Sequence, residues 1–461
     1  MIPMTLAEVA RATGGWLADA PDPLATVTGV VFDSRHVGAG DLFLALPGEH
    51  TDGHDFARAA VAAGAAGVLA TYPVGVPAVV VDDVLGALSA LARAALARLP
   101  DLTVIGVTGS SGKTSTKDLV AALVTRLGAT VAPPGSFNNE LGHPYTVLLA
   151  GEDTHYLVLE YSARGLGHIA ALCRVARPHI AVELNVGSAH LGEFGSVAVV
   201  AQAKAELVAS LDATGVAVLN ADDPRVRAMA GATAGRVVLT GTARDAGVRA
   251  DDVVLDDWGR PSYTLVAGGT RTPVTLHLHG EHHVANSLAA AAVALELGMS
   301  SAEVATVLGE ARPVSRWRME VTDRPDGVTV VNDAYNANPE SMRAAVRALA
   351  AMGRGRRTWA VLGHMAELGE HSAGEHELLG RLVAQSGVDR LVAVGPQASP
   401  VHAGAVHAGA QEGEAVEVAD VEAALRLLRA ELRSGDVVLV KASRAAGLER
   451  VALALTGEGG A

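Results

Sequence analysis

Residues 104–117, VIGVTGSSGKTSTK, combine the side chains and glycines that a phosphate-binding loop needs. Gly109 and Gly112 allow positive φ angles and a close approach of backbone amides to oxyanions. Lys113 can neutralise phosphate oxygens, and the hydroxyl of Thr114 or Ser115 can bind Mg²⁺. The loop alone leaves three uses of the phosphate open: a switch, a kinase reaction, or the activation of a carboxylate.

The loop departs from the standard P-loop, which has a glycine five positions before the glycine of the Gly-Lys pair. Val107 stands at that position. An apolar strand is expected over 102–108 and a helix from about Lys113, with Ser115 in its first turn. This order directs the positive end of the helix dipole at bound phosphate. The alternative is a Gly/Ser-rich turn with an incidental lysine.

Two further side chains could take part in metal chemistry. Glu160 ends the apolar run HYLVLE, and open α/β sheets bind ligands at the carboxyl ends of their strands. His190 follows another strand end in NVGSAHLGEFG. Each has a plainer interpretation: a strand-end surface Glu160 and an ordinary surface His190. From the residues alone, Lys204 in AQAKAELV is expected to lie with Glu206 on an exposed helix face.

The elements that position these residues alternate between strand-like and helical runs, which is typical of α/β proteins. Three blocks are predicted, over residues 1–100, 101–312 and 313–461. The second opens with the phosphate loop, continues through apolar strands, and contains a more β-like insert at 262–280. The third repeats strand-then-helix pairs, which indicates a smaller sheet of the nucleotide-binding kind.

Composition narrows the class of function. The chain has 461 residues, of which 49% are hydrophobic, and its net charge is 36 − 50 = −14, which argues against a general nucleic-acid binder. The one cysteine, Cys173, excludes an intramolecular disulfide and fits a reducing cytoplasm; its helical apolar surroundings favour core packing over a nucleophilic role. No signal peptide and no run long enough to span a bilayer is predicted.

The longer motifs resemble those of a known family. TGSSGKT, GSFNNELGHP, SAHLGEFGS and QAKAEL occur in this order and resemble the Mur ligases of peptidoglycan synthesis. The loop motif is shared with folylpolyglutamate synthases. NDAYNANPESM and DSRHVGAGDLFLALPGEHTDGHDF are more specific, and they resemble the member that adds D-Ala-D-Ala to UDP-N-acetylmuramoyl-tripeptide.

The resemblance implies a three-domain α/β fold: an N-terminal domain for the UDP end of the substrate, a central P-loop-type ATPase domain with a parallel sheet, and a C-terminal Rossmann-like domain. It implies an ATP-dependent amide ligase that works through an acyl phosphate. Two Mg²⁺ ions and a carbamylated Lys204 are implied as well. The expected protein is a cytoplasmic monomer without nucleic-acid partners or membrane insertion.

Residue roles follow from the same resemblance. Catalytic roles are implied for Lys113, Lys204, His190, Glu160 and Arg318. Mg²⁺ ligands would be Thr114, Glu160, His190 and Lys204. ATP would contact Gly109, Ser110, Ser111, Gly112, Lys113, Thr114 and Ser115, with Asn286 at the adenine, Arg318 at the phosphates and Asp333 at the ribose. The other substrates would meet Asp33, Ser34 and Arg35 (uridine diphosphate), Asn138 and Asn139 (sugar or peptide), Asn336 and Asn338 (closed site), and Lys441, Ser443 and Arg444 (dipeptide).

Some residues depart from the family pattern. Tyr161 and Ser162 follow Glu160 where smaller residues are expected, Glu183 lies within an apolar strand, and Asn332 and His364 replace frequent aspartates. A buried carboxylate at Glu183 must find a partner or take a raised pKa. Two alternatives therefore stay open: a ligase of the same scaffold with another carboxylate and amine, and a non-catalytic UDP-sugar or ATP binder.

Overall fold

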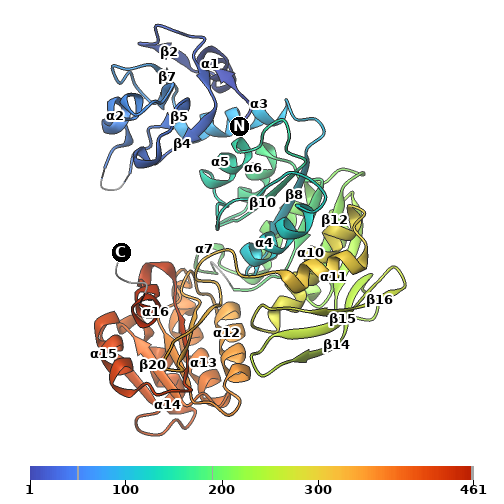
Figure 1. The fold of residues 1–461 in the computed structure, drawn as a ribbon, viewed down its shortest axis with the longest axis vertical. Helices are drawn as coiled ribbons and strands as arrows, with labels where there is room; N and C mark the ends of the chain where they lie inside the picture. The colour runs from blue at the N-terminus through green and yellow to red at the C-terminus, as the bar shows by residue number, and fades with distance from the viewer. Residues whose placement is uncertain (49–50, 189–190, 458–461) are drawn as a thin grey trace. The chain divides into compact units, whose positions relative to one another are not determined.

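The computed structural model describes residues 1–48, 51–188 and 191–457, and the chain forms two compact units (Figure 1). The first unit comprises Met1–Gly106, Leu127–Ser162 and Ile169–His179. The second comprises Val107–Arg126, Ala163–His168 and the chain from Ile180 onward. Among the described residues, no helix is long and apolar enough to cross a membrane.

The first unit contains a mostly parallel sheet with the strand order β2-β7-β6-β5-β4, in which β2 runs antiparallel to β7. The runs GVLA and AVV of β6 and β7 are buried throughout, as expected for strands covered on both faces. The elements up to the phosphate loop are β1 (Met4–Thr5), α1 (Leu6–Thr13), β2 (Trp16–Ala18), β3 (Thr26–Val27), β4 (Gly29–Val31), β5 (Asp41–Leu44), α2 (Ala57–Ala62), β6 (Gly67–Ala70), β7 (Ala78–Val80), α3 (Val84–Leu96) and β8 (Thr103–Thr108).

The first unit also receives a later part of the chain, in which β9 and β10 pair in parallel. Glu160 is the last residue of β10, as the sequence predicts. Cys173 is buried in α6, which agrees with its predicted packing role. The elements here are β9 (Thr130–Val131), α5 (Gly142–Leu148), β10 (Tyr156–Glu160) and α6 (His168–Val175).

In the second unit, strands β11 to β16 lie side by side in chain order. The pairings from β11 to β14 are parallel, and β14, β15 and β16 form an antiparallel ribbon. The elements are α4 (Lys113–Val124), β11 (Ile180–Glu183), α7 (Leu191–Phe194), α8 (Val197–Ala209), β12 (Val216–Asn220), α9 (Pro224–Ala228), β13 (Arg236–Gly241), β14 (Val248–Leu255), β15 (Pro261–Ala267), β16 (Thr270–Thr275), α10 (His282–Glu296) and α11 (Ser301–Glu310).

Helix α10 packs against α4, the helix that follows the phosphate loop. Residues 289–294, AAAAVA, are fully or almost fully buried. Alanine side chains are small, so the backbones of two packed helices can approach closely. The Ala-rich sequence of α10 thereby fixes α4, and with α4 the position of the loop.

The second unit contains a second sheet, the C-terminal sheet, with the strand order β17-β18-β22-β19-β20-β21. All its pairings are parallel except that of β17 with β18. The elements are β17 (Glu320–Asp323), β18 (Thr329–Asn332), α12 (Pro339–Met352), β19 (Thr358–Leu362), α13 (Ser372–Gln385), β20 (Arg390–Val394), α14 (Ser399–His407), β21 (Ala415–Val418), α15 (Val421–Glu431), β22 (Val437–Lys441) and α16 (Glu449–Thr456).

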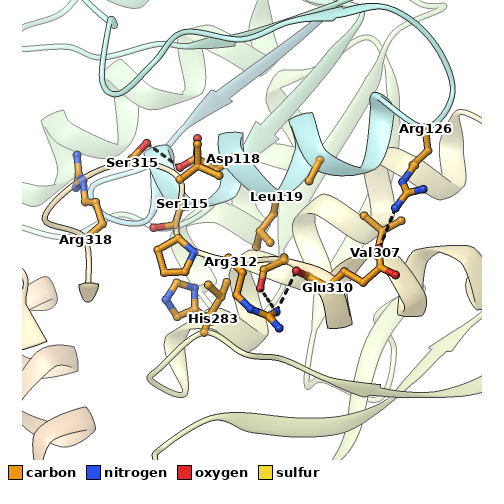
Figure 2. A pocket seen from close by; sticks show the side chains of 15 residues that line it. Ser115, Asp118, Leu119, Arg126, His283, Val307, Glu310, Arg312, Ser315 and Arg318 are labelled. Carbon is orange, nitrogen blue, oxygen red and sulfur yellow. Dashed lines mark hydrogen bonds and ion pairs between the residues drawn. The ribbon is translucent and has the colours of Figure 1, made fainter. Parts of the chain in front are cut away.

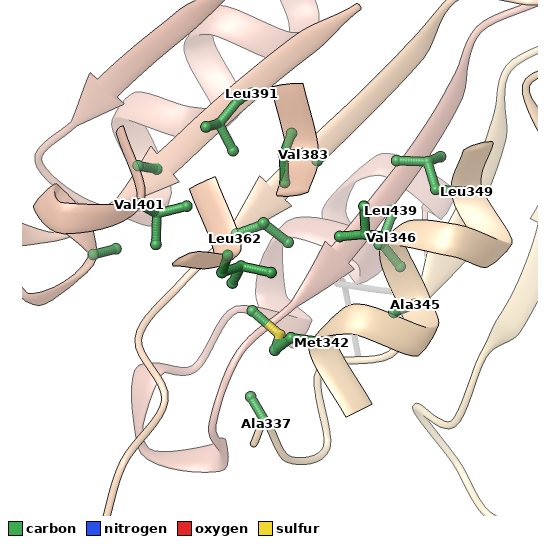
Figure 3. Packing of buried hydrophobic residues seen from close by; sticks show 14 of the residues in the cluster. Ala337, Met342, Ala345, Val346, Leu349, Leu362, Val383, Leu391, Val401 and Leu439 are labelled. Atoms are coloured by element: carbon green, nitrogen blue, oxygen red, sulfur yellow. The ribbon is translucent and has the colours of Figure 1, made fainter. Parts of the chain in front are cut away.

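Helices cover both faces of this second sheet, as in Rossmann-like folds. On one face, Met342, Val346 and Leu349 of α12 pack against Leu362 and Leu439 of the strands (Figure 3). On the other face, a separate apolar cluster contains buried residues of α15 and α16. The predicted α/β class is confirmed; the three predicted blocks and their boundaries at 100/101 and 312/313 remain predictions.

Candidate functional site

The phosphate loop joins β8 to α4, and α4 begins at Lys113 as predicted. Gly112 is the N-cap residue, with φ +81°, and no side chain caps the helix start. A Cβ atom at Gly112 would lie 2.6 Å from Oδ1 of Asn286, so only glycine fits this turn. The N-terminal amides of α4 therefore remain available to an anion.

Asn185 lies two residues after β11 and forms hydrogen bonds with the phosphate loop. Its carbonyl accepts the Ser110 N–H at 3.0 Å, and its Oδ1 accepts the Ser111 N–H at 2.9 Å. Lys113 Nζ donates to the carbonyl of Gly109 at 2.8 Å, which folds this side chain back over the loop. The sequence analysis did not identify Asn185, although a polar residue just after a buried strand was the available signal.

Arg318 reaches the same loop from the segment that precedes β17. Its Nη2 donates to Oγ1 of Thr114 at 3.0 Å, and its guanidinium carbon lies 4.1 Å from the centre of the Tyr335 ring. The Nε atom of Arg318 is buried and has no hydrogen-bond partner among the described residues. Arg318 is thus a cation positioned beside the loop, and its predicted contact with phosphate remains a prediction.

Glu183 and Lys204 are charged groups buried beside Lys113. Glu183 is 1% exposed and Lys204 is 7% exposed, so the interpretation of Lys204 as part of an exposed helix face is wrong. Burial, more than the opposing charges of the two lysines, raises the pKa of Glu183 well above its usual value. Burial and the charge of Lys113 lower the pKa of Lys204 to about 7, against the attraction of Glu183.

Glu160 belongs to the first unit and is completely buried, so its interpretation as a surface residue is wrong. Its Oε2 accepts hydrogen bonds from Ser136 Oγ and from Asn138 Nδ2, both at 3.1 Å. Its Oε1 is buried without a hydrogen-bond partner in the described part of the chain. Asn139 accepts the Gly142 N–H at 2.9 Å at the start of α5.

From the sequence, the side chain of Tyr161 is large enough to crowd a metal ion bound at Glu160. Its side chain is fully buried, its hydroxyl donates to the Ala176 carbonyl at 2.5 Å, and its ring packs edge-on against His143. Ser162 donates to the backbone carbonyl of Asn138 at 2.9 Å. Both departures are therefore accommodated by packing and hydrogen bonds within the first unit.

Asp333 lies just beyond β18 and forms an ion pair with Lys441, the last residue of β22. Lys441 Nζ lies 2.6 Å from Asp333 Oδ2 and 2.9 Å from the Asn336 carbonyl, and the Met319 N–H donates to Asp333 Oδ1 at 3.0 Å. Lys441 is only 2% exposed. Asn338 caps α12 through the Ser341 N–H, and its Nδ2 donates to the Ser110 carbonyl at 3.1 Å.

Of the remaining predicted substrate residues, Asp33, Ser34 and Arg35 belong to the first unit, and Ser443 and Arg444 belong to the second. Asp33 accepts from Arg35, whose side chain is exposed, and Ser34 begins a short 3₁₀ turn. Ser443 accepts the Ala366 N–H at 2.8 Å, and the guanidinium carbon of Arg444 lies 4.1 Å from the centre of the Trp317 ring.

A cavity of about 280 Å³ lies beside α4, lined by Ser115 and Asp118 of that helix, by His283 of α10 and by residues 311–315 (Figure 2). Ser315 Oγ donates to Asp118 Oδ2 at 2.7 Å. Burial, together with the neighbouring histidines, lowers the pKa of His283 well below its usual value, so His283 is neutral. Its Nδ1 has no hydrogen-bond partner among the described residues.

The second unit thus brings together the whole loop, Lys204, Asn286, Arg318, Asp333, Asn336, Asn338 and Lys441. Asp33, Ser34, Arg35, Asn138, Asn139 and Glu160 belong to the first unit. His190 lies outside the described residues. Within the described part, no group of three His, Cys, Asp or Glu side chains is arranged to hold a metal ion on its own.

Comparison with known families gives three matches along the chain. Residues 26–95 match the Mur ligase family, catalytic domain; residues 107–294 match the Mur ligase middle domain; and residues 317–444 match the Mur ligase, glutamate ligase domain.

Two curated relatives carry the same name. The chain is 54% identical to the UDP-N-acetylmuramoyl-tripeptide–D-alanyl-D-alanine ligase of Mycobacterium tuberculosis, over 99% of this chain and 98% of the relative. It is 35% identical to the ligase of the same name from Escherichia coli, over the full length of both.

Solved structures agree with these relatives. MurF from Acinetobacter baumannii superposes with a TM-score of 0.89 at 31% identity, over 99% of both chains. MurF ligase from Thermotoga maritima in complex with ADP gives a TM-score of 0.81 at 31% identity, over 94% of this chain and 98% of the other.

Proposed function

Because the chain belongs to the Mur ligase family, we propose that it joins D-Ala-D-Ala to UDP-N-acetylmuramoyl-tripeptide at the expense of ATP, in peptidoglycan precursor synthesis. The observation that carries this proposal is the phosphate loop at Gly109–Ser115, held by Asn185 and contacted by Arg318, in a chain that matches ligases of this name along its whole length. The protein is an ATP-dependent peptide ligase.

The chemistry follows from the substrates. A carboxylate is a poor electrophile, so the terminal carboxylate oxygen of the tripeptide attacks the γ-phosphorus of ATP, giving an acyl phosphate and ADP. The amine of D-Ala-D-Ala then attacks the acyl carbon and loses a proton. The tetrahedral intermediate expels phosphate and leaves an amide. The protein must hold both substrates in line and keep water from the acyl phosphate.

The loop suits the triphosphate. Gly112 opens the start of α4 to an anion, and Lys113 Nζ already lies at the loop, where it donates to the Gly109 carbonyl. Arg318 adds a second cation next to Thr114. We assign the β- and γ-phosphates to these groups, because fixed cations stabilise the charge that moves during phosphoryl transfer.

We place the adenine at the cavity beside α4. His283 lines this cavity and precedes Asn286 by one turn of α10, and both side chains have buried nitrogen atoms without hydrogen-bond partners among the described residues. A purine base offers ring nitrogens and an exocyclic amine to such atoms. We assign Asn286 and His283 to the base and Asp333 to the ribose.

Mg²⁺ would screen the negative charges of the phosphates when bound. The residues present fit it in one respect: Oε1 of Glu160 is a buried carboxylate oxygen without a hydrogen-bond partner in the described chain, which suits a hard cation. We assign Glu160 and Thr114 as ligands of one ion and His190 with Lys204 as ligands of a second. Glu160 and Thr114 belong to different units, so their pairing remains a prediction.

Lys204 suits modification by CO₂. Its nitrogen is neutral in a large fraction of molecules at neutral pH, because burial and Lys113 lower its pKa to about 7. The lone pair of this nitrogen attacks the carbon of CO₂, an N–C bond forms, and one proton is released to solvent. The carbamate carries a negative charge and two oxygens, which suits Mg²⁺ better than an ammonium group does.

The remaining assignments concern the other substrates. We propose Asp33, Ser34 and Arg35 for the uridine diphosphate, Asn138 and Asn139 for the sugar or peptide, and Asn336 and Asn338 for the closed site. Lys441 is buried on Asp333, which favours a role in holding that carboxylate over direct contact with the dipeptide. A cytoplasmic monomer remains our proposal, in keeping with the nucleotide substrates.

One experiment tests the function. Purified protein is incubated with ATP, Mg²⁺, UDP-N-acetylmuramoyl-tripeptide and either D-Ala-D-Ala or another amine, and phosphate release is followed together with product mass. We expect release, and a product heavier by the dipeptide minus water, only with D-Ala-D-Ala. Release with a different amine selects another ligase of this scaffold, and no release with any amine selects a binding protein.

A further inference from the structure

Residues 185–188, NVGS, connect the end of β11 to the chain that leads toward His190, and we call them the connecting segment. Every residue of the segment is hydrogen-bonded. Asn185 bonds the amides of Ser110 and Ser111, and the Gly187 N–H donates to Ser110 Oγ at 2.8 Å. The Val186 N–H donates to Oδ2 of Asp223 at 2.8 Å. The geometry of the phosphate loop thus depends on this segment.

The last residue of the segment is bound by Glu340, in the first turn of α12. Oε1 of Glu340 accepts the Ser188 N–H at 3.0 Å and the Ser188 hydroxyl at 3.1 Å. Gly187 makes the approach possible, because a Cβ atom there would lie 2.3 Å from Cδ of Glu340. Ser188 is buried, so these bonds are shielded from competing water.

The start of α12 contacts the phosphate loop at a second point. Asn338, the N-cap of α12, donates from Nδ2 to the Ser110 carbonyl at 3.1 Å. The start of α12 thus acts on Ser110 in two ways. Asn338 contacts Ser110 directly, and Glu340 contacts it through the connecting segment. The rest of α12 is anchored by Met342, Val346 and Leu349 in the core of the C-terminal sheet.

We propose that Glu340 is a positioning residue for the nucleotide site: its carboxylate sets the connecting segment, and through it the phosphate loop, relative to the C-terminal sheet. Glu340 contacts no reacting atom in this scheme. It acts on Ser110, which is bonded to Gly187, and so on the amides that face the phosphates. The inference rests on the proposed function only for its effect on turnover.

The variants distinguish the positioning of the phosphate loop by Glu340 from a general contribution to the stability of the fold. Glu340→Ala removes the acceptor, and Glu340→Asp withdraws the carboxylate by one methylene while keeping its charge. Glu340→Gln keeps a carbonyl oxygen at Oε1, which accepts the two shorter bonds from Ser188, and loses only the 3.4 Å acceptor at Oε2. Glu375→Ala is the matched control, because Arg343 forms ion pairs with both carboxylates, at 3.6 Å with Glu340 and at 2.7 Å with Glu375.

The measurements are hydrogen–deuterium exchange of peptides covering residues 107–115 and 184–188 in the ligand-free full chain, the thermal midpoint, and kcat with KM for ATP. We expect Glu340→Ala and Glu340→Asp to raise exchange in both peptides and to lower kcat by about tenfold to a hundredfold. Glu340→Gln and Glu375→Ala should behave like the wild type in both peptides.

Wild-type exchange at 107–115 in Glu340→Ala, or a loss of kcat in Glu375→Ala equal to that in Glu340→Ala, would overturn the proposal. If Glu340→Ala does not fold, Glu340→Asp decides by the same criteria. Exchange is measured without substrates, so it tests the role of Glu340 even if the ligation reaction is not the one proposed. Failure of the wild type to ligate D-Ala-D-Ala counts against the function alone.

Discussion

Lys113 is the cation on which the phosphate loop depends, since it begins α4 and already lies over the loop. We expect Lys113→Ala to lower kcat by about 10²- to 10³-fold, the usual cost of removing one preorganised charge from a transition state. The thermal midpoint should stay within a few degrees of wild type. Phosphate release and thermal unfolding are measured together, with the exposed Arg429→Ala in α15 as a control. Retained phosphate release in the variant would contradict the role of Lys113.

Lys204 gives a prediction that depends on CO₂. We expect Lys204→Ala to fold and to lose about a hundredfold or more in kcat, as when a metal-binding group is disturbed. Acetate should restore part of the activity, because it can supply an oxygen ligand in the vacated volume. With ¹³C-bicarbonate, a carbamate resonance should appear in the wild type and be absent in the variant. Wild-type turnover of Lys204→Ala in bicarbonate-free buffer would show that the lysine needs no modification.

Glu183 predicts a pH dependence of stability. Its pKa is raised in the folded protein, so the native state holds a proton that the unfolded chain releases as pH rises above about 4.5. Wild-type stability should therefore fall relative to Glu183→Gln as pH rises from 4 to 8. At pH 8 we expect the variant to be more stable by about 1–3 kcal/mol, the cost of an unsatisfied buried polar group. Urea unfolding at both pH values measures this difference. A variant less stable at pH 8 would show that Lys113 and Lys204 fully compensate the carboxylate.

The sequence predicted the place of some ionisable residues of the site but not the burial of others. Lys113 follows from its place between a strand and a helix, which is local information. The burial of Lys204 and Glu160 cannot be predicted from local sequence. Which face of a helix or which strand end is buried depends on residues that are distant in sequence. Asn185 was missed for the same reason: its side chain bonds Ser111, which lies 74 residues earlier in the chain.

At the scale of elements, the turn from β8 into α4 leaves no space for a side chain at Gly112. We expect Gly112→Ala to destabilise the fold by about 1–2 kcal/mol through its positive φ, and to weaken ATP binding through contact with Asn286. Gly14→Ala is the matched control, because Gly14 has φ +71° and a Cβ atom there would have no neighbour within 4 Å. Urea unfolding and ATP titration are measured for both. Equal ATP affinities in the two variants would show that contact with Asn286 does not matter.

The sequence predicted a strand where apolar residues run continuously, as in β10, which ends at Glu160 as expected. The missed strands differ in pattern. β14, VRADDVVL, is part of the antiparallel ribbon and its residues alternate between covered and exposed, so its charges hide its strand character. β17 and β21 are short strands at the two edges of the second sheet, where burial is incomplete.

At the scale of the whole molecule, the proposed division of labour assigns ATP and the UDP substrate to different parts of the chain. We expect Asp333→Ala to weaken ATP binding by about tenfold to a hundredfold, the value of a hydrogen bond involving a charged group. Binding of the UDP substrate should be unchanged. Calorimetric titration of each ligand measures this, with Asp333→Asn as the milder variant that keeps one acceptor for the Met319 amide. Equal losses for both ligands would contradict the division.

The path of the chain between the units has a consequence for synthesis in the cell. The first unit is completed only by residues 169–179, after the chain has already contributed 107–126 to the second unit. Domains usually fold in order as they leave the ribosome. Here a nascent chain of about the first hundred residues lacks β9, β10 and α5, and the phosphate loop emerges before its partner Asn185 exists. We therefore expect the packing of α3 against α5 to form only once the chain has grown past residue 148, although the buried core within residues 18–80 is complete much earlier.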